Sequence, residues 1–256
     1  MRPALAVLAL SLAATAIATD PVRAQAWVMA PGAGQAILKV EAMRADDGFD
    51  PSGDRAALPA PRADDVASLY LEYGLFEGVA VLLKADWQDG RDAFVDFEGR
   101  GPVELGLRWQ VWRDDRAVVS LQASIAEGGE GRNAGYAAPG AGERDYEVRL
   151  AAGRAFPLSG RRAFAEVQAA RRLRDGLSDE TRLDATLGLH LDDDWMLLGQ
   201  AFGGMADDDG PRWLNVETSV VRAWGNWSVQ LGWRSAVAGR ETPAASGPVI
   251  GLWHRF

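Results

Sequence analysis

The chain has 256 residues, with 27 Lys and Arg against 36 Asp and Glu, and it contains no Cys. This acidic balance argues against nucleic-acid binding, which requires a basic surface. Without Cys, the chain can form no disulfide, perform no thiol chemistry and carry no Cys-linked lipid anchor. No linker or composition break divides the chain behind its N-terminal segment, so we predict a single domain.

The N-terminus has the features of an export signal. One positive charge precedes an almost unbroken apolar run at residues 4–14, and small residues follow. An apolar stretch too short to cross a bilayer, followed by a small-residue site, is typical of a secretory signal peptide. We predict residues 1–26 as the signal and 27–256 as the mature domain, with cleavage after Ala26 and, as the alternative, after Ala18. Removing the signal leaves 25 basic and 35 acidic residues, a net charge near −10.

Behind the signal, apolar and polar residues alternate with a period of two. In residues 68–75, Leu, Leu, Tyr and Leu share one face, and Ser, Tyr, Glu and Gly share the other. Such alternation predicts β-strands with one apolar face. The segments run to about ten residues, the length that a tilted strand needs to cross hydrocarbon, whereas soluble strands average five or six. About twelve are predicted, at residues 34–45, 64–76, 79–89, 101–113, 116–127, 144–156, 161–174, 181–192, 195–206, 212–224, 227–238 and 246–256.

The predicted connections alternate between long and short. Residues 46–63 form a long connection and residues 77–78 a tight turn, and the alternation continues along the chain. External loops and short periplasmic turns alternate in this way in outer-membrane barrels, whereas a Greek-key sandwich has no reason to do so. An even number of strands closes a barrel with both ends on one side. We therefore predict an all-β fold, a closed up-and-down antiparallel transmembrane β-barrel.

The polar faces of the strands carry both signs of charge. In a soluble barrel the apolar faces of twelve strands would have to fill the interior, which is awkward at this size. We therefore place lipid outside and charges inside. Because acids and bases alternate, we expect salt-bridged networks and a narrow, weakly selective or closed pore. The predicted lumen-lining residues are Lys39, Glu41, Glu72, Lys84, Asp86, Glu104, Arg108, Glu147, Arg149, Glu166, Arg172, Arg182, Asp184, Glu217 and Arg234.

The exceptions to this polarity lie near strand ends. Arg154, Arg171 and Arg222 fall on the apolar faces, but near a strand end a lipid-side Arg costs little. Aromatic residues gather at the predicted periplasmic ends of the strands, as expected where rings meet lipid headgroups. These aromatic residues are Tyr73, Phe76, Trp109, Trp112, Phe156, Trp195, Trp224, Trp227 and Phe256.

The last predicted strand ends on Phe256 without a polar tail. Gly251 lies five residues before it, and His254 stands two residues before it, where Tyr or Phe is commoner in outer-membrane barrels. With the signal, the strands and the connections, this ending resembles the Gram-negative outer-membrane β-barrel superfamily, as a small porin-like barrel. The resemblance implies that Gly251, His254 and Phe256 form an assembly signal read by the barrel-assembly machinery. It also implies contact with outer-membrane lipid and lipopolysaccharide.

The resemblance implies an architecture and leaves the function open. We expect a narrow passive channel for small hydrophilic solutes, or a non-enzymatic envelope component. One alternative is a structural or interaction barrel accessory to surface-polysaccharide export. Another is a membrane-embedded lipid hydrolase, for which His190, with Asp184 and Thr186 on the same face, is the candidate. No His-x-Ser pairing accompanies it, and neither His lies at the predicted outer rim.

We predict no cofactor and no metal site. The acidic clusters at residues 192–194 and 207–209 lack the spaced ligands and the distal Glu of a helix-loop-helix calcium site, so we predict solvated turns. The Gly-rich residues 128–131 fall in a predicted loop rather than between a strand and a helix. They therefore do not predict a phosphate-binding loop.

Overall fold

The computed structural model describes residues 26–94, 96–129 and 144–256. The predicted signal peptide, apart from Ala26, lies outside the described residues. So do residues 130–143, which make up most of the predicted loop that begins at Gly128. The described part contains no helix long and apolar enough to cross a membrane. Its strands are β1 (Gly34–Phe49), β2 (Arg55–Phe76), β3 (Val79–Arg91), β4 (Asp96–Arg113), β5 (Ala117–Glu127), β6 (Arg144–Leu158), β7 (Arg161–Arg174), β8 (Glu180–His190), β9 (Trp195–Ala206), β10 (Arg212–Trp224), β11 (Trp227–Arg240), β12 (Thr242–Pro243) and β13 (Ser246–Arg255).

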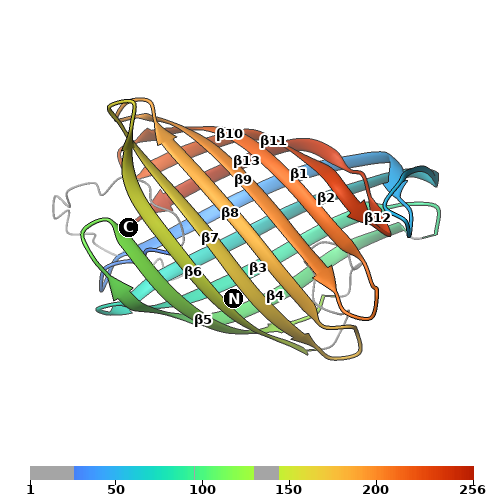
Figure 1. Ribbon diagram of the computed structural model, residues 1–256, viewed down its shortest axis with the longest axis horizontal. Coiled ribbons are helices and arrows are strands. Elements are labelled where there is room, and N and C mark those ends of the chain that lie inside the picture. The colour runs from blue at the N-terminus through green and yellow to red at the C-terminus, as the bar shows by residue number, and fades with distance from the viewer. Residues whose placement is uncertain (1–25, 95, 130–143) are drawn as a thin grey trace, which may run out of the picture.

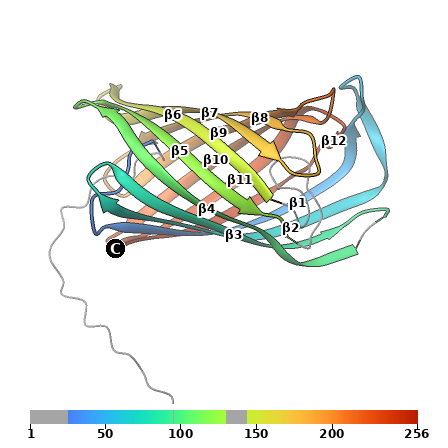
Figure 2. The ribbon, with the colours of Figure 1, turned by 90° about the horizontal axis from the view of Figure 1, so that it is seen from below.

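Antiparallel pairing closes these strands into a barrel. From β1 to β11, each strand pairs with the next one along the chain, β11 pairs with β13, and β13 pairs with β1. The two-residue β12 pairs with the end of β1. The other twelve strands therefore form the predicted closed up-and-down barrel, and the strands are tilted against its long axis (Figures 1 and 2). Closure leaves no long free edge, as a membrane-spanning sheet requires.

The alternation gives the wall two faces of opposite chemistry. Leu105 and Leu107 of β4 are 53% and 54% exposed, whereas Glu104 and Arg108 on the same strand are 6% and 2% exposed. Exposed and buried residues alternate in the same way along β6 and β10. Apolar side chains therefore cover the outside, and charged side chains point inward. This polarity is the one that suits a barrel surrounded by hydrocarbon.

The long connections are shorter than predicted, because the strands extend into them. Most of the predicted loop 46–63 is a hairpin in which β1 continues to Phe49 and β2 begins at Arg55. Pro59 and Pro61 weaken the strand pattern there. Both prolines precede Ala63, where β2 begins to pair with β3. This part of β2 is therefore an edge, where proline is tolerated because one side of the strand has no neighbour to receive an N–H.

Aromatic side chains mark the end of the barrel that carries the short turns, which we call the periplasmic end. The guanidinium group of Arg222 lies 5.2 Å from the ring of Trp195, an arrangement suited to the headgroup level. Phe156 is partly buried. The other aromatic residues predicted there are exposed, namely Tyr73, Phe76, Trp109, Trp112, Trp195, Trp224, Trp227 and Phe256.

The carboxy terminus belongs to the seam that closes the barrel. The backbone N–H of Phe256 donates to the carbonyl of Gly34 at 3.0 Å, and the N–H of Gly34 donates back at 2.7 Å. The ring of His254 lies 4.2 Å from that of Trp227 and 5.8 Å from that of Phe256. Gly251 lies between β1 and β11. These residues therefore stabilise the seam, and their recognition by the assembly machinery stays a prediction.

Candidate functional site

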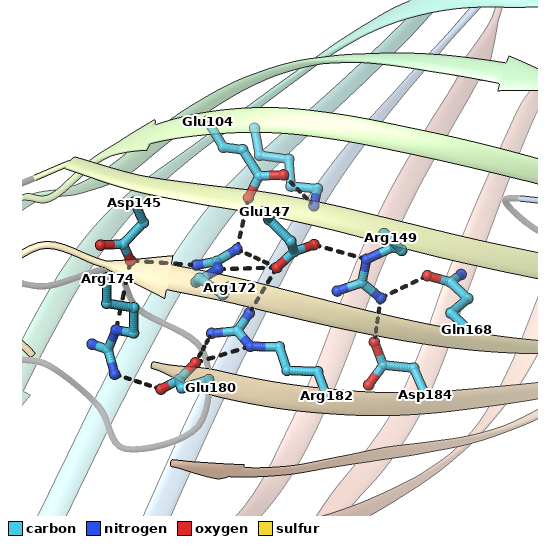
Figure 3. A network of polar contacts seen from close by, with 11 residues as sticks. Glu104, Asp145, Glu147, Arg149, Gln168, Arg172, Arg174, Glu180, Arg182 and Asp184 are labelled. Carbon is cyan, nitrogen blue, oxygen red and sulfur yellow. Dashed lines mark hydrogen bonds and ion pairs between the residues drawn. The ribbon is translucent and has the colours of Figure 1, made fainter. Parts of the chain in front are cut away.

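Ten charged side chains form one network inside the barrel, which we call the charged layer (Figure 3). Five are basic and five acidic, so the charges balance. Most of them are buried, and buried charges persist only when they are paired. The charged layer consists of Lys84, Glu104, Asp145, Glu147, Arg149, Arg172, Arg174, Glu180, Arg182 and Asp184.

Glu147 of β6 lies at the centre of the charged layer. Its carboxylate accepts hydrogen bonds from Arg149 at 2.8 Å and from Arg172 at 2.9 Å, and Arg182 lies 3.7 Å away. The strand register explains one of these contacts, because Glu147 stands opposite Arg172 on β7 and opposite charges attract across a strand pair. Arg149 also reaches Asp184 of β8 at 2.6 Å.

One contact of the charged layer joins strands that are not neighbours. Arg172 of β7 lies 3.1 Å from Glu104 of β4, although β5 and β6 separate these strands in the wall. The contact therefore runs through the interior of the barrel. Lys84 of β3 binds the other oxygen of Glu104 at 3.0 Å. The network thus connects β3 to β8 across the inside of the wall.

A second group of charges lies on β1, β10 and β11. Arg234 contacts Glu41 at 2.8 Å and Glu217 at 2.7 Å, and Lys39 lies 3.2 Å from each of these carboxylates. Both cations also face the ring of Phe202, with Arg234 4.7 Å and Lys39 5.9 Å from its centroid. This group contains two bases and two acids, so it too is balanced.

A third group centres on Arg108, which is 2% exposed. Its guanidinium donates to Glu72 of β2 and to Gln122 of β5, both at 2.8 Å. The hydroxyl of Tyr70 accepts a hydrogen bond from Arg108 at 3.3 Å and donates one to Glu72 at 2.5 Å. The buried cation thus has one carboxylate and two neutral partners, which satisfy a charge that burial would otherwise destabilise.

Near the periplasmic end the interior is apolar instead of charged. Four buried residues of β7, β9 and β10 form a cluster against which two Trp side chains pack. We call these six residues the apolar layer: Trp27, Phe164, Met196, Leu198, Val221 and Trp253. Phe164 shares the inward face of β7 with Arg172, and Val221 shares that of β10 with Glu217. Alternation separates the inside from the outside, but it does not indicate how the inside changes with depth.

Glu166 lies on β7 between the two layers. It is 2% exposed and accepts hydrogen bonds from the side chain of Gln168 and from the backbone N–H of Ala26. Among the described residues, no Lys or Arg side chain lies within ion-pair distance of it. A buried carboxylate with neutral donors alone is unusual, since burial of a charge normally requires an opposite charge nearby.

The structure places all fifteen predicted lumen residues on strands and brings most of them together. All except Asp86 take part in an ion pair or a hydrogen bond of the kinds described above; Asp86 forms no direct ion pair with any described residue. The sequence analysis missed Asp145, Arg174 and Glu180. Asp145 and Arg174 lie on the same strand face as residues that were predicted to line the lumen, so the apolar and polar alternation alone would have found them. Glu180 precedes residue 181, where the predicted strand begins.

His190 is not arranged as a hydrolytic centre. It is buried, and its ring packs 6.4 Å from that of Phe164. Asp184, the acidic partner considered for it, is bound by Arg149 at 2.6 Å, and Thr186 accepts a hydrogen bond from Gln200. Among the described residues, no cluster of His, Asp and Glu is arranged to hold a metal ion.

The acidic clusters outside the strands form turns and surface contacts. Asp192 accepts the backbone N–H groups of Asp194 and Trp195 at 2.9 and 2.8 Å. Asp207 binds Arg171, which donates to both of its carboxylate oxygens. The Arg171 hydrogen bond holds the pKa of the Asp207 carboxyl below its ordinary value. Asp192 therefore caps a turn, and Asp207 belongs to a surface ion pair.

No protein-family model matches this chain, and no curated protein matches its sequence. Its fold is similar to that of solved outer-membrane proteins. The COG4313 outer membrane channel from Pseudomonas putida F1 is 14% identical, with a TM-score of 0.68 over 93% of this chain and all of that one. The NanC porin is 9% identical, with a TM-score of 0.56 over 85% and 98% of the two chains.

The KdgM porin is 7% identical to this chain, with a TM-score of 0.54 over 86% of this chain and 99% of that one. At these identities the likeness concerns the fold. The chain thus has the twelve-stranded barrel fold of outer-membrane porins, as the sequence predicts.

Proposed function

We propose that this protein is a narrow outer-membrane channel that passes small hydrophilic solutes with weak charge selectivity. The observation that carries the proposal is a closed barrel with an apolar outer face and charged residues inside. Intramembrane charges normally face a water-filled cavity or one another, and they mark solute pathways. The side chains of Lys39 and Lys84, 18% and 34% exposed, remain in contact with solvent inside the barrel. The fold shared with named channels and porins supports the same function.

The contacts across the interior support a narrow passage. Arg172 joins β7 to β4, and Lys39 joins β1 to Glu217 of β10. Neither pair of strands is adjacent in the barrel. Each contact therefore places side chains where an open lumen would hold water. Such pairing favours small solutes over large ones, because pore width and lining groups set selectivity.

The balance of charge supports weak selectivity. The charged layer has five bases and five acids, and the group around Glu217 has two of each. A passage selective for anions needs an excess of Arg and Lys along its wall, and a passage selective for cations needs an excess of carboxylates. Neither excess is present in these two groups. Outer-membrane lipid and lipopolysaccharide around the barrel, and its insertion by the assembly machinery, belong to the same proposal.

Conductance in planar lipid bilayers tests the function. We expect small, steady single-channel steps and a reversal potential close to zero in a KCl gradient. Lys39→Gln removes one cation while Arg234 still holds Glu41 and Glu217, so it should shift the reversal potential toward cation selectivity. The matched control is Arg44→Gln on the same strand, whose side chain is 54% exposed and pairs with Asp65. No conductance, or equal shifts in both variants, would contradict the proposal.

The apolar layer favours a second candidate, a barrel with a filled interior that acts through its surface. Trp27 and Trp253 pack inside one end of the barrel against four buried residues. If this layer closes the barrel completely, neither the wild type nor a variant with smaller side chains in the charged layer conducts. A role as an accessory to surface-polysaccharide export would then be tested by binding of polysaccharide to the intact barrel. We do not propose lipid hydrolysis, because Asp184, the acidic partner considered for His190, forms an ion pair with Arg149.

A further inference from the structure

Two of the predicted lumen carboxylates, Asp86 of β3 and Glu166 of β7, lie outside the three groups of paired charges. Neither forms an ion pair with a Lys or Arg of the described residues. Glu166 is 2% exposed and is bound by neutral donors, so it is sealed inside the wall. Asp86 lies on the inward face of its strand and is only partly buried. It is therefore the unpaired lumen charge that solvent inside the barrel reaches.

The strand register explains why Asp86 lacks a basic partner. Other lumen carboxylates stand directly opposite a base on the neighbouring strand, where opposite charges attract. These pairs are Glu104 with Lys84, Glu147 with Arg172, and Glu217 with Arg234. Asp86 stands opposite Ser68 on β2, which carries no charge. An interior that is otherwise matched thus leaves this one position open on the side of β2.

On its other side, Asp86 faces a β-bulge. The register shifts there, so that one residue of β3 faces two residues of β4, Gly101 and Pro102. Neither carries a charge, and Pro102 has no backbone N–H to offer the carboxylate. A Cβ at Gly101 would lie 2.8 Å from the Cβ of Asp86, so a larger residue would displace this side chain. Bulges re-aim side chains and are common beside functional sites.

The charges around Asp86 neutralise one another and leave its own charge over. The side chains whose charges act on it are Glu41, Lys84 and Glu104. Lys84 is bound to Glu104 at 3.0 Å, and it remains in contact with solvent. Glu41 is bound to Arg234 at 2.8 Å. A carboxylate left unbalanced on a solvated wall raises the local concentration of cations and lowers that of anions.

We propose that Asp86 is the selectivity-determining residue of the passage and gives it a preference for small cations over anions. The inference rests on the proposed channel function and deepens it, because it names the class of solute that the passage favours. The charged layer and the group around Glu217 keep the preference weak, since each of them is balanced. A metal cation or a solute with an ammonium group is the chemistry that a lone carboxylate attracts.

The reversal potential in a KCl gradient tests the role of Asp86. The wild type should pass K⁺ slightly better than Cl⁻. Asp86→Asn removes the charge and keeps the shape, so the ratio of K⁺ to Cl⁻ permeability should fall by about two- to fourfold, the effect of one unit charge about 5–10 Å from an ion in water. Asp86→Glu retains the charge and should keep the wild-type ratio. Asp89→Asn is the matched control, because Asp89 is exposed on the outer face of the same strand.

The outcomes separate this inference from the channel function. Should Asp86→Asn fail to fold, Asp86→Ser removes the same charge with a smaller side chain and should lower the ratio equally. A barrel that conducts with one ratio in the wild type and in these variants overturns the role of Asp86 and leaves the channel function standing. A wild type that prefers Cl⁻, or a variant in which only the size of the conductance step changes, overturns the role as well. A wild type that never conducts overturns both.

Discussion

In the charged layer every side chain comes from a strand of the wall (Figure 3). The apolar layer, by contrast, takes one member, Trp27, from the segment that precedes β1. The charged layer depends on matched partners, such as the three Arg around Glu147. The apolar layer depends on filled volume. The comparison teaches that the interior of the barrel is stabilised in two ways, by matched charges at one level and by filled volume at another.

The largest effect on stability is expected in the charged layer. Arg172→Ala leaves Glu104 and Glu147 buried with fewer partners, and breaking a buried pair in this way costs about 3–5 kcal/mol. Arg171→Ala is the neighbouring control. Arg171 is 41% exposed, where an ion pair contributes at most about 1 kcal/mol. Urea unfolding of both variants in liposomes measures the loss of unfolding free energy. Equal losses would show that the buried ion pairs of Arg172 stabilise the barrel no more than the exposed pairs of Arg171.

A matched change in the apolar layer should cost somewhat less. Met196 is 2% exposed, and Met196→Ala is expected to destabilise the barrel by about 2–5 kcal/mol through the cavity it leaves. Met196→Leu should cost less than about 1.5 kcal/mol, because volume is nearly kept. By contrast, Arg172→Lys keeps the charge but loses the planar group that contacts Glu104 and Glu147 together. If Arg172→Lys is tolerated as well as Met196→Leu, the two layers do not differ as described.

The outer face gives a third comparison, between charge outside and charge inside. Leu105→Arg places a cation on the lipid face, which costs about 2–4 kcal/mol near the midplane of the bilayer. Gln200→Arg points inward, where Glu217 stands opposite on β10. We expect the first variant to lower the amount of folded protein in outer membranes and the second to leave it unchanged. Heat-shifted gel mobility of membrane fractions measures the folded amount, and equal loss would mean that the faces are assigned wrongly.

The sequence predicts the wall of this barrel much better than its contents. Strand alternation identifies Leu105 as outward and Glu104 as inward, because the side chains of a strand change face at every residue. Pairing inside the barrel depends instead on strands far apart in sequence, so the contact of Arg172 with Glu104 is invisible to alternation. The apolar layer was missed for a related reason: Phe164 and Arg172 share one face of β7 at different depths.

The position of Trp27 was not predictable from periodicity, since the segment before β1 belongs to no strand. Gly74 and Gly153 interrupt the rows of inward-facing side chains on β2 and β6. These two glycines are the one signal in the sequence that another part of the chain approaches the wall there. A glycine in a strand marks the close approach of another backbone or ring, but it does not say which one.

The smallest effect is expected at the surface, on the pair of Arg171 and Asp207. The hydrogen bond from Arg171 lowers the pKa of Asp207 in the folded protein, so the pair contributes stability above the ordinary carboxyl pKa of about 3.9. That contribution is lost as the pH falls through the lowered value. Asp207→Asn should therefore unfold slightly more easily than the wild type at neutral pH, and the difference should shrink in acid.

Asp208→Asn is the control for this surface pair. Asp208 has a positive φ of 56°, which Asn tolerates, and its side chain contacts Ser178 rather than an Arg. Urea unfolding at neutral and acidic pH compares both variants with the wild type. Because Arg171 also lies 3.2 Å from Asp179, part of its pairing survives in Asp207→Asn. A loss that is larger in acid than at neutral pH would contradict the assigned direction of the pKa shift, because protonation of Asp207 removes the ion pair in the wild type as well.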